Sequence, residues 1–368
     1  MPSISSTVLD ERGSVLSSSD HPAFDMAALP AGSSARAMVY RSVSGIDGKG
    51  TEVSGAVFLP PGTPPPGGWP VIGYAHGTIG VTSDCGSTGD PRLFGDIDGV
   101  AAQLSRHHAV VFTDYAGLRG GSAPIADTPH AYLEPKSAAF NLIDAVRAAR
   151  SFVPQLSDRW VAMGDSQGGE TAWATAEYNA KYGQGLDLLG AAAIVPALEV
   201  SDVVRHAQDE TLTRDDLALY PYVITGLAAV DPSLKLDDYL HGPMLDQRET
   251  LISCSSQAED RKSQIQETLT AADAKPSSPE AADRLARRLA DYALPQLPTS
   301  VPVLAVYGGA DDTVAPEWTE AAVEKGCALG DTVLRVRVEG QGHGLDPGAQ
   351  LSPWIADRFA GAPAPNNC

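Results

Sequence analysis

A serine flanked by glycines two positions away on each side stands in Gly164-Asp165-Ser166-Gln167-Gly168. The apolar stretch 160–163 precedes it and a helix-forming stretch follows it, which is the strand–turn–helix setting of a nucleophilic serine. Such a turn strains the serine backbone and brings neighbouring chain close, so only small residues fit beside it. We expect Ser166 to be the nucleophile, raised above a sheet at the start of a helix; the alternative is a glycine-rich turn with an idle serine.

A serine hydroxyl is a poor nucleophile until a base removes its proton. Of the 8 histidines in the chain, His343 is the expected base, since it lies on a late loop in Gly340-Gln341-Gly342-His343-Gly344. The surrounding glycines leave room for the ring to approach Ser166. His130, also in a loop, is the strongest rival.

The imidazole in turn needs a carboxylate that holds its tautomer and stabilises its protonated form. Asp311 and Asp312 both follow the apolar stretch 301–307, and we favour Asp311 with Asp312 as the alternative. The order Ser166, Asp311, His343 is the serine–acid–histidine order of one large hydrolase fold.

Attack on a carbonyl creates an oxyanion that two backbone N–H groups must stabilise. One donor is expected to be Gln167, directly after the nucleophile at the helix start. The other is expected to be Thr78, in the loop His76-Gly77-Thr78 after an early strand. His76 is expected to orient this loop rather than to bind a metal or act as a base. No zinc-protease motif, phosphate-binding loop or dinucleotide fingerprint occurs, so the sequence predicts neither a cofactor nor a metal.

These side chains require a framework in which strands and helices alternate. A hairpin over 37–44 and 51–59 is followed by an order of elements that predicts a mostly parallel sheet wrapped by helices, the α/β class. The further expected strands cover 71–75, 109–113, 160–163, 191–195, 301–307 and 333–339, and the expected helices cover 100–107, 138–152, 168–182, 317–329 and 350–360.

The alternation divides the chain into three parts. Residues 1–35 are expected to form an irregular N-terminal arm, and residues 36–200 with 300–368 the catalytic core. Residues 201–299 are polar, helix-prone and interrupted by prolines, so they predict an inserted helical cap or lid. Whether its apolar stretch lines an acyl pocket or packs within the cap is open; the residues concerned are Tyr220, Pro221, Tyr222, Val223, Ile224, Leu227 and Ala228.

Composition narrows the classes of partner. The chain of 368 residues is 43% hydrophobic, enough for a sizeable core, and carries a net charge of −20. Such an acidic surface repels phosphate backbones and anionic lipids, which argues against nucleic acid and electrostatic membrane docking. No apolar run reaches the roughly 20 residues of a membrane helix. A neutral small molecule or lipid ester is the expected substrate; the oligomeric state is left open.

The cysteines and the N-terminus bear on the compartment. No export signal is visible, so the chain is expected to be cytoplasmic or a mature secreted form. The four cysteines are far apart and show no metal spacing, and they suit either two disulfides in an exported protein or four buried thiols.

Several motifs together resemble the secretory lipase (lipase A-like) family of the α/β-hydrolase superfamily. The resemblance runs over 74–78, 114–118, 130–133, 144–150 and 164–169, and returns at 308–311 and 342–344. It implies lipase or esterase activity, a helical cap that shapes the acyl site, and no cofactor. It also implies that Cys85 pairs with Cys254 and Cys327 with Cys368. Asp165 stands where relatives often carry His or Tyr.

The sequence therefore predicts ester hydrolysis through an acyl-enzyme carried by Ser166, His343 and Asp311. An acyltransferase or a specialised ester or amide hydrolase would use the same three residues. A third alternative is a non-catalytic hydrolase-fold protein that binds a ligand, and the intact triad argues against it.

Overall fold

One nine-stranded sheet organises the chain in the computed structural model, which describes residues 1–20, 23–121, 125–126, 128–254 and 258–368. The strand order is β1-β2-β3-β5-β4-β6-β7-β8-β9; the first three pairings are antiparallel and the remaining ones parallel. The strands are β1 (Val15–Asp20), β2 (Ser34–Val43), β3 (Gly50–Leu59), β4 (Trp69–Ala75), β5 (Ala109–Thr113), β6 (Leu156–Asp165), β7 (Asp187–Ile194), β8 (Val303–Gly308) and β9 (Val333–Val338).

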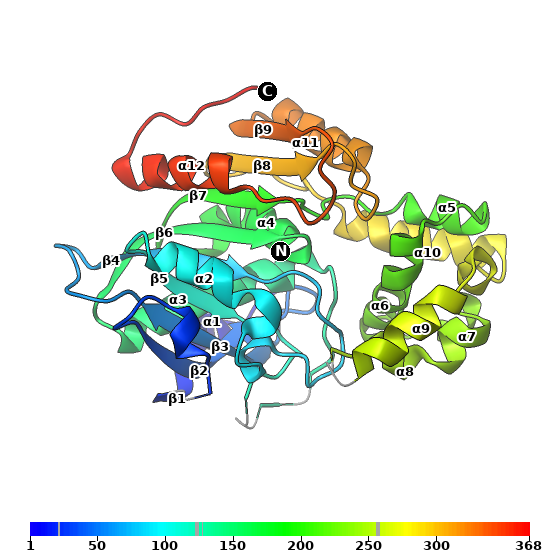
Figure 1. The fold of residues 1–368 in the computed structure, drawn as a ribbon, viewed down its shortest axis with the longest axis horizontal. Helices are drawn as coiled ribbons and strands as arrows, with labels where there is room; N and C mark the ends of the chain where they lie inside the picture. The colour runs from blue at the N-terminus through cyan, green and yellow to red at the C-terminus, as the bar shows by residue number, and fades with distance from the viewer. Residues whose placement is uncertain (21–22, 122–124, 127, 255–257) are drawn as a thin grey trace.

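Helices cover both faces of this sheet, which explains why its central strands are apolar on both sides. All five residues of β5 are buried. On one face α3 (Pro135–Phe152), α4 (Gln167–Tyr182) and α11 (Pro316–Leu329) pack against one hydrophobic cluster. On the other face α2 (Ile97–Leu104) and α12 (Gly348–Ala360) pack against a second cluster and lie in front of the sheet in Figure 1.

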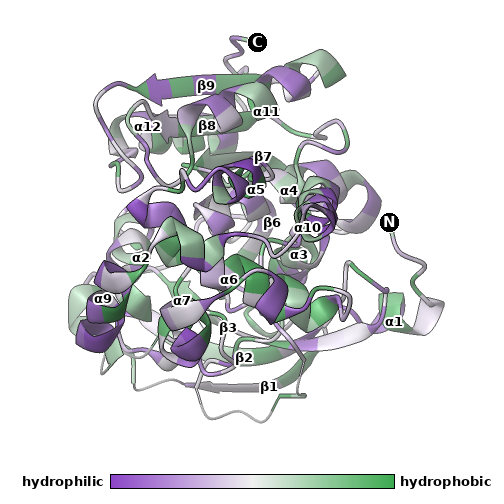
Figure 2. Ribbon diagram, turned by 90° about the vertical axis from the view of Figure 1, so that its right-hand side faces the viewer, coloured by the Kyte–Doolittle hydropathy of each residue, from purple (hydrophilic) through white to green (hydrophobic). Residues whose placement is uncertain are grey.

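A helical insertion separates β7 from β8 and lies beyond the carboxyl ends of the parallel strands (Figure 1). No strand occurs in its described part, residues 201–254 and 258–299. Its helices carry both hydrophilic and hydrophobic turns (Figure 2), and the hydrophobic ones form a third cluster. The helices are α5 (Val203–Gln208), α6 (Arg214–Val230), α7 (Gly242–Asp246), α8 (Arg248–Leu251), α9 (Glu259–Thr268) and α10 (Pro279–Tyr292).

The expected strands and helices of the core are all present, with ends that shift by a few residues. The irregular arm expected over 1–35 is wrong in part, because this segment contains α1 (Ser6–Glu11) and the edge strand β1. Four of the six residues of β1 are polar and five are exposed, so the strand shows no hydrophobic alternation. Its pairing with β2 depends on backbone hydrogen bonds, which leave no trace in the side-chain pattern.

Two disulfides join distant parts of the chain, with the pairing that the resemblance implies. Sγ of Cys85 lies 2.16 Å from Sγ of Cys254, which ties the loop after β4 to the insertion. Sγ of Cys327 lies 2.11 Å from Sγ of Cys368, which ties α11 to the C-terminal segment. In the part of the chain that the structure describes, no helix combines the length and the apolar character needed to cross a bilayer.

Candidate active site

Ser166 occupies a strained turn between β6 and α4. Its backbone has φ 53° and ψ −115°, a conformation that L-residues rarely adopt and that is typical of functional turns. The glycines on either side are required by space: a Cβ on Gly164 would lie 2.4 Å from the carbonyl oxygen of Ala75, and a Cβ on Gly168 only 1.9 Å from the same atom. The sequence motif therefore folds as the sharp strand-to-helix turn that it predicts.

His343 and Asp311 lie on the loops that follow β9 and β8. The Nδ1 of His343 lies 2.8 Å from Oδ2 of Asp311, whose carboxylate is almost fully buried. The other carboxylate oxygen accepts hydrogen bonds from the backbone N–H groups of Thr313 and Val314, both at 2.9 Å. Asp312 is exposed and makes no bond to the imidazole. Of the two candidate acids, the structure brings only Asp311 to His343.

Ser166 and His343 line the same pocket, which has a volume of about 410 Å³. Among the described residues no hydrogen bond joins the Ser166 hydroxyl to the imidazole, although catalytic bonds are often long before substrate binds. Because Asp311 engages Nδ1 of His343, Nε2 is the ring nitrogen that this carboxylate leaves free. The remaining lining residues are Gly77, Thr78, Ile79, Phe94, Asp96, Asp165, Asp215, Ala218, Leu219 and Thr313.

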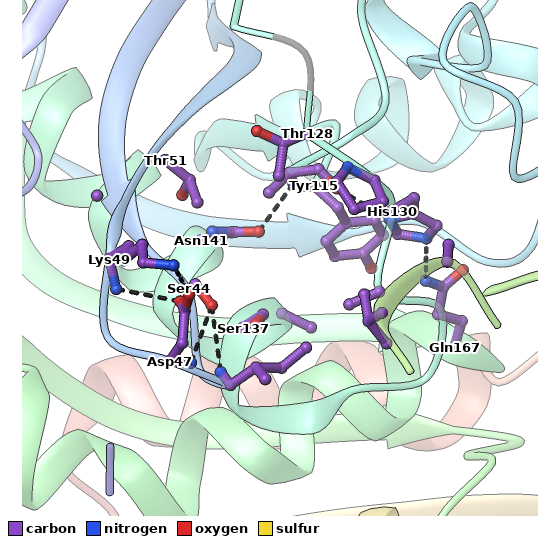
Figure 3. A pocket seen from close by; sticks show the side chains of 18 residues that line it. Ser44, Asp47, Lys49, Thr51, Tyr115, Thr128, His130, Ser137, Asn141 and Gln167 are labelled. Atoms are coloured by element: carbon purple, nitrogen blue, oxygen red, sulfur yellow. Dashed lines mark hydrogen bonds and ion pairs between the residues drawn. The ribbon is translucent and has the colours of Figure 1, made fainter. Parts of the chain in front are cut away.

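The two expected oxyanion donors follow different strands of the sheet, β4 and β6. Gln167 is the first residue of α4, so its N–H has no partner within the helix, and Thr78 follows β4 and lines the pocket. Neither N–H donates a backbone hydrogen bond to any residue that the structure describes. The Gln167 side chain lines a second pocket of about 380 Å³, beside His130 (Figure 3).

Neither of the other two histidines considered from the sequence lines the pocket with Ser166. His76 is fully buried, its Nδ1 lies 2.7 Å from the carbonyl oxygen of Gly77, and its ring packs 4.5 Å from that of Tyr115. Burial lowers its pKa, as suits a neutral histidine that holds the loop. His130 lines the second pocket rather than the one with Ser166. Burial lowers its pKa to about 4.

Sequence reasoning did not place two carboxyl groups of the pocket. Asp165, noted above only as a departure from its relatives, lines the pocket together with Asp96. Burial raises the pKa of both carboxyls, that of Asp96 to about 7, and the neighbouring Asp165 adds to the shift of Asp96. An aspartate at a helix start usually complements the helix dipole, so Asp96 gave no separate signal.

The residues of the insertion that line the pocket with Ser166 are not the apolar stretch considered from the sequence. α6 contributes Asp215, Ala218 and Leu219 to the pocket. The seven apolar residues proposed as an acyl lining are absent from it, and most are buried in the cluster of the insertion itself. Of the two readings left open, packing within the insertion is therefore the one the structure supports.

One grouping of metal-type ligands occurs among the described residues, formed by Asp84, Cys85 and Cys254. Both sulfurs belong to a disulfide, so they lack the thiolate that binds a metal. This grouping therefore does not fit a metal site.

Comparison with known proteins identifies the family and the fold of the chain. The model of the secretory lipase family matches residues 95–367. A ligand-bound rice cell wall degrading esterase, LipA from Xanthomonas oryzae, superimposes with a TM-score of 0.73 at 23% identity, over 90% of this chain and 92% of that chain. Candida antarctica lipase A in its closed state gives a TM-score of 0.73 at 15% identity, over 99% and 87%. No curated protein sequence matches.

The family match covers well over half of the chain, and the solved structures share its α/β-hydrolase fold, with the mostly parallel sheet and flanking helices described above. A lipid or other ester is the substrate that this family implies. The chain therefore belongs to the secretory lipase family and is a carboxylic ester hydrolase of the α/β-hydrolase fold.

Proposed function

We propose that the chain cleaves its esters through a covalent acyl-enzyme on Ser166, with His343 as the base and Asp311 as the residue that orients it. The observation that carries this proposal is the 2.8 Å contact between Nδ1 of His343 and Oδ2 of Asp311 beside the pocket that His343 shares with Ser166. It leaves Nε2 of the imidazole unengaged by Asp311, and a free Nε2 is what general-base activation of a serine needs.

In the first half-reaction, Nε2 of His343 takes the proton of Ser166 while Oγ forms a bond to the ester carbonyl carbon. The resulting oxyanion accepts hydrogen bonds from the N–H groups of Thr78 and Gln167. Collapse breaks the bond to the alcohol oxygen, which leaves with the proton from His343. Water then repeats these steps on the acyl-enzyme and releases the carboxylic acid.

The insertion, residues 201–299, is proposed to act as a cap over this site. Its helix α6 brings Ala218 and Leu219 to the pocket, where they join Ile79 and Phe94 from the core. These apolar side chains offer a surface for the acyl chain. Asp96 and Asp165 line the same pocket, and in their ionised form they disfavour an anionic substrate group.

Replacing the nucleophile tests the mechanism. The variant Ser166→Ala is expected to keep its thermal midpoint but to lose about four or more orders of magnitude in kcat for a p-nitrophenyl ester. A fluorophosphonate should label the unaltered enzyme on Ser166 and leave the variant unlabelled. Near-native turnover by the variant would contradict the assignment. A series of p-nitrophenyl esters of increasing acyl length then reports how long a chain the apolar wall accepts.

The acid is tested by a matched pair of neighbouring substitutions. Asp311→Asn is expected to lower kcat by about 10⁴-fold, because the amide no longer holds the imidazole in the productive tautomer. Asp312→Asn serves as the control and should stay within a few-fold, since that side chain is exposed. A larger loss at 312 than at 311 would show that the wrong carboxylate was chosen.

A further inference from the structure

Each of the two proposed oxyanion donors is held by a side chain from one short segment, residues 130–132. The first contact joins His130 to Gln167, where Nε2 of the imidazole lies 3.2 Å from the amide Nε2 of the glutamine (Figure 3). The other ring nitrogen, Nδ1, lies 3.0 Å from the carbonyl oxygen of Ala116. Both ring nitrogens of His130 are therefore in contact with a hydrogen-bond partner, and only 6% of its surface is exposed.

These contacts fix the tautomer of His130. A carbonyl oxygen can only accept, so Nδ1 must carry the proton and donate it to Ala116. Burial lowers the pKa of His130 to about 4, so the ring is neutral near pH 7 and Nε2 is an acceptor. The amide of Gln167 therefore donates to His130. This bond anchors the residue whose backbone N–H begins α4 beside Ser166.

The second contact joins Tyr132 to Thr78. The phenol oxygen of Tyr132 lies 2.7 Å from Oγ1 of Thr78, and the tyrosine is almost fully buried. Thr78 sits in an irregular loop without backbone hydrogen bonds of its own amide to the described chain, so its position depends on side-chain contacts. Tyr115 adds support two residues earlier in this loop, since its hydroxyl donates to the carbonyl oxygen of His76 at 2.9 Å.

We propose that His130 and Tyr132 are positioning residues that hold the Gln167 and Thr78 amides at the spacing an oxyanion requires. One short segment thereby fixes two donors that follow different strands, β4 and β6. The inference rests on the proposed function, because it assumes that these two amides are the oxyanion donors. A displacement of about 1 Å at such donors is enough to lose up to 100-fold in rate.

The insertion supports the same segment. A Cβ on Gly226 of α6 would lie 2.4 Å from Cβ of Tyr132, so the helix backbone packs directly on the tyrosine. The ring of Tyr222, one turn earlier, lies 6.3 Å from the ring of Tyr132. The position of α6 is thereby linked to Thr78 through Tyr132, which makes the oxyanion site depend on the placement of the insertion.

The Tyr132 contact is tested by a double-mutant cycle. Tyr132→Phe removes only the hydroxyl, and Thr78→Val removes only its partner while keeping the amide. Each variant is expected to lower kcat for a p-nitrophenyl ester by about 10- to 100-fold with KM changed less than about twofold. The double variant should be no slower than the slower single one, because both remove the same bond.

Tyr239→Phe is the matched control, since it deletes a buried tyrosine hydroxyl that donates to Ala281 at 3.0 Å elsewhere in the insertion. It should lower the thermal midpoint about as much as Tyr132→Phe and leave kcat within twofold. If Tyr132→Phe leaves kcat equally unchanged, or if its loss multiplies with that of Thr78→Val, the positioning role of Tyr132 is refuted.

His130 is tested in the same way by His130→Phe, with His108→Phe as the control. His108 is also buried, with its Nδ1 3.0 Å from Oε1 of Gln103 and a pKa that burial lowers to about 4. We expect a loss in kcat only at 130, with a matching loss of affinity for a boronic acid that mimics the tetrahedral intermediate. Equal effects at both positions would refute the role of His130.

The outcome also separates this inference from the proposed function. If the unaltered enzyme is labelled by a fluorophosphonate on Ser166 and Ser166→Ala is inactive, the acyl-enzyme mechanism stands, whatever the variants at 130 and 132 do. Failure at those positions alone then removes only the positioning role. If Ser166→Ala remains active, the proposed mechanism falls first.

Discussion

The disulfide between Cys85 and Cys254 should contribute more to stability than the one between Cys327 and Cys368. The first closes a loop with a sequence separation of 169 residues, the second a loop of 41 residues. A cross-link stabilises mainly by restricting the unfolded chain, and in the chain-entropy description the effect grows with the logarithm of loop length. This relation gives about 5 kcal/mol for the longer loop and about 4 kcal/mol for the shorter one at 25 °C.

The burial of the cysteines increases this difference in stability between the two disulfides. Cys85 is fully buried, so Cys85→Ala combined with Cys254→Ala also leaves a small cavity, whereas Cys368 is exposed. Guanidinium unfolding of the two double variants, followed by circular dichroism, measures both losses. The longer loop should cost at least about 1 kcal/mol more than the shorter one. A loss as large or larger for the pair Cys327→Ala and Cys368→Ala would refute the reasoning from loop length.

The same two variants separate stability from activity. The longer loop ties the insertion to the chain that follows Thr78, so opening it should lower kcat at a temperature where both variants remain folded. Opening the C-terminal disulfide should leave kcat unchanged, because α11 and the C-terminal segment contribute no residue to the pocket with Ser166. Equal activity of the two variants would contradict a link between the insertion and the site.

Three further substitutions test other parts of the structure. Gly168→Ala should lower the free energy of unfolding by at least about 1–3 kcal/mol and remove most of the activity, because its Cβ would lie 1.9 Å from the Ala75 carbonyl oxygen. Gly50→Ala is the control in both assays, since the nearest atom to its Cβ would lie 3.9 Å away. Glu170→Gln should raise the thermal midpoint at pH 8, because burial raises the pKa of the Glu170 carboxyl, whose Oε2 lacks a hydrogen-bond partner, whereas the unfolded chain ionises it near pH 4–5. A lower midpoint would argue against a protonated Glu170. The folded state holds a proton on Asp96 up to about pH 7, whereas the unfolded state loses it near pH 4, so stability falls as pH rises between these values. In urea unfolding at pH 5, 6 and 7, Asp96→Asn should flatten this decline. An unchanged slope would refute the role of Asp96.

Much of the core was predictable because its signals are local. β5 is apolar throughout, since both faces of a central parallel strand are covered, and its expected limits 109–113 are those observed. The edge strand β1 was not predictable, because exposed side chains carry no alternation and pairing is made by the backbone. For the same reason a polar serine-rich segment was expected to be irregular.

The insertion, residues 201–299, shows a feature that local sequence patterns did not predict. Its helical character was evident, but the face of α6 that turns toward Ser166 was not, because the helix buries apolar residues against its own neighbours and presents Asp215, Ala218 and Leu219 to the pocket. Both faces carry apolar residues, so only packing against the core distinguishes them.

The sequence by itself determined the family, the α/β class and the turn at Ser166, because each depends on residue types at fixed short spacing. Only the tertiary structure decided that Asp311 rather than Asp312 meets His343, that Asp165 turns into the pocket beside Asp96, and that residues 130–132 reach both Thr78 and Gln167. These contacts join residues that are 32 to 69 positions apart in the sequence. Their geometry is set by how strands and loops pack against one another, which short-range sequence patterns do not encode.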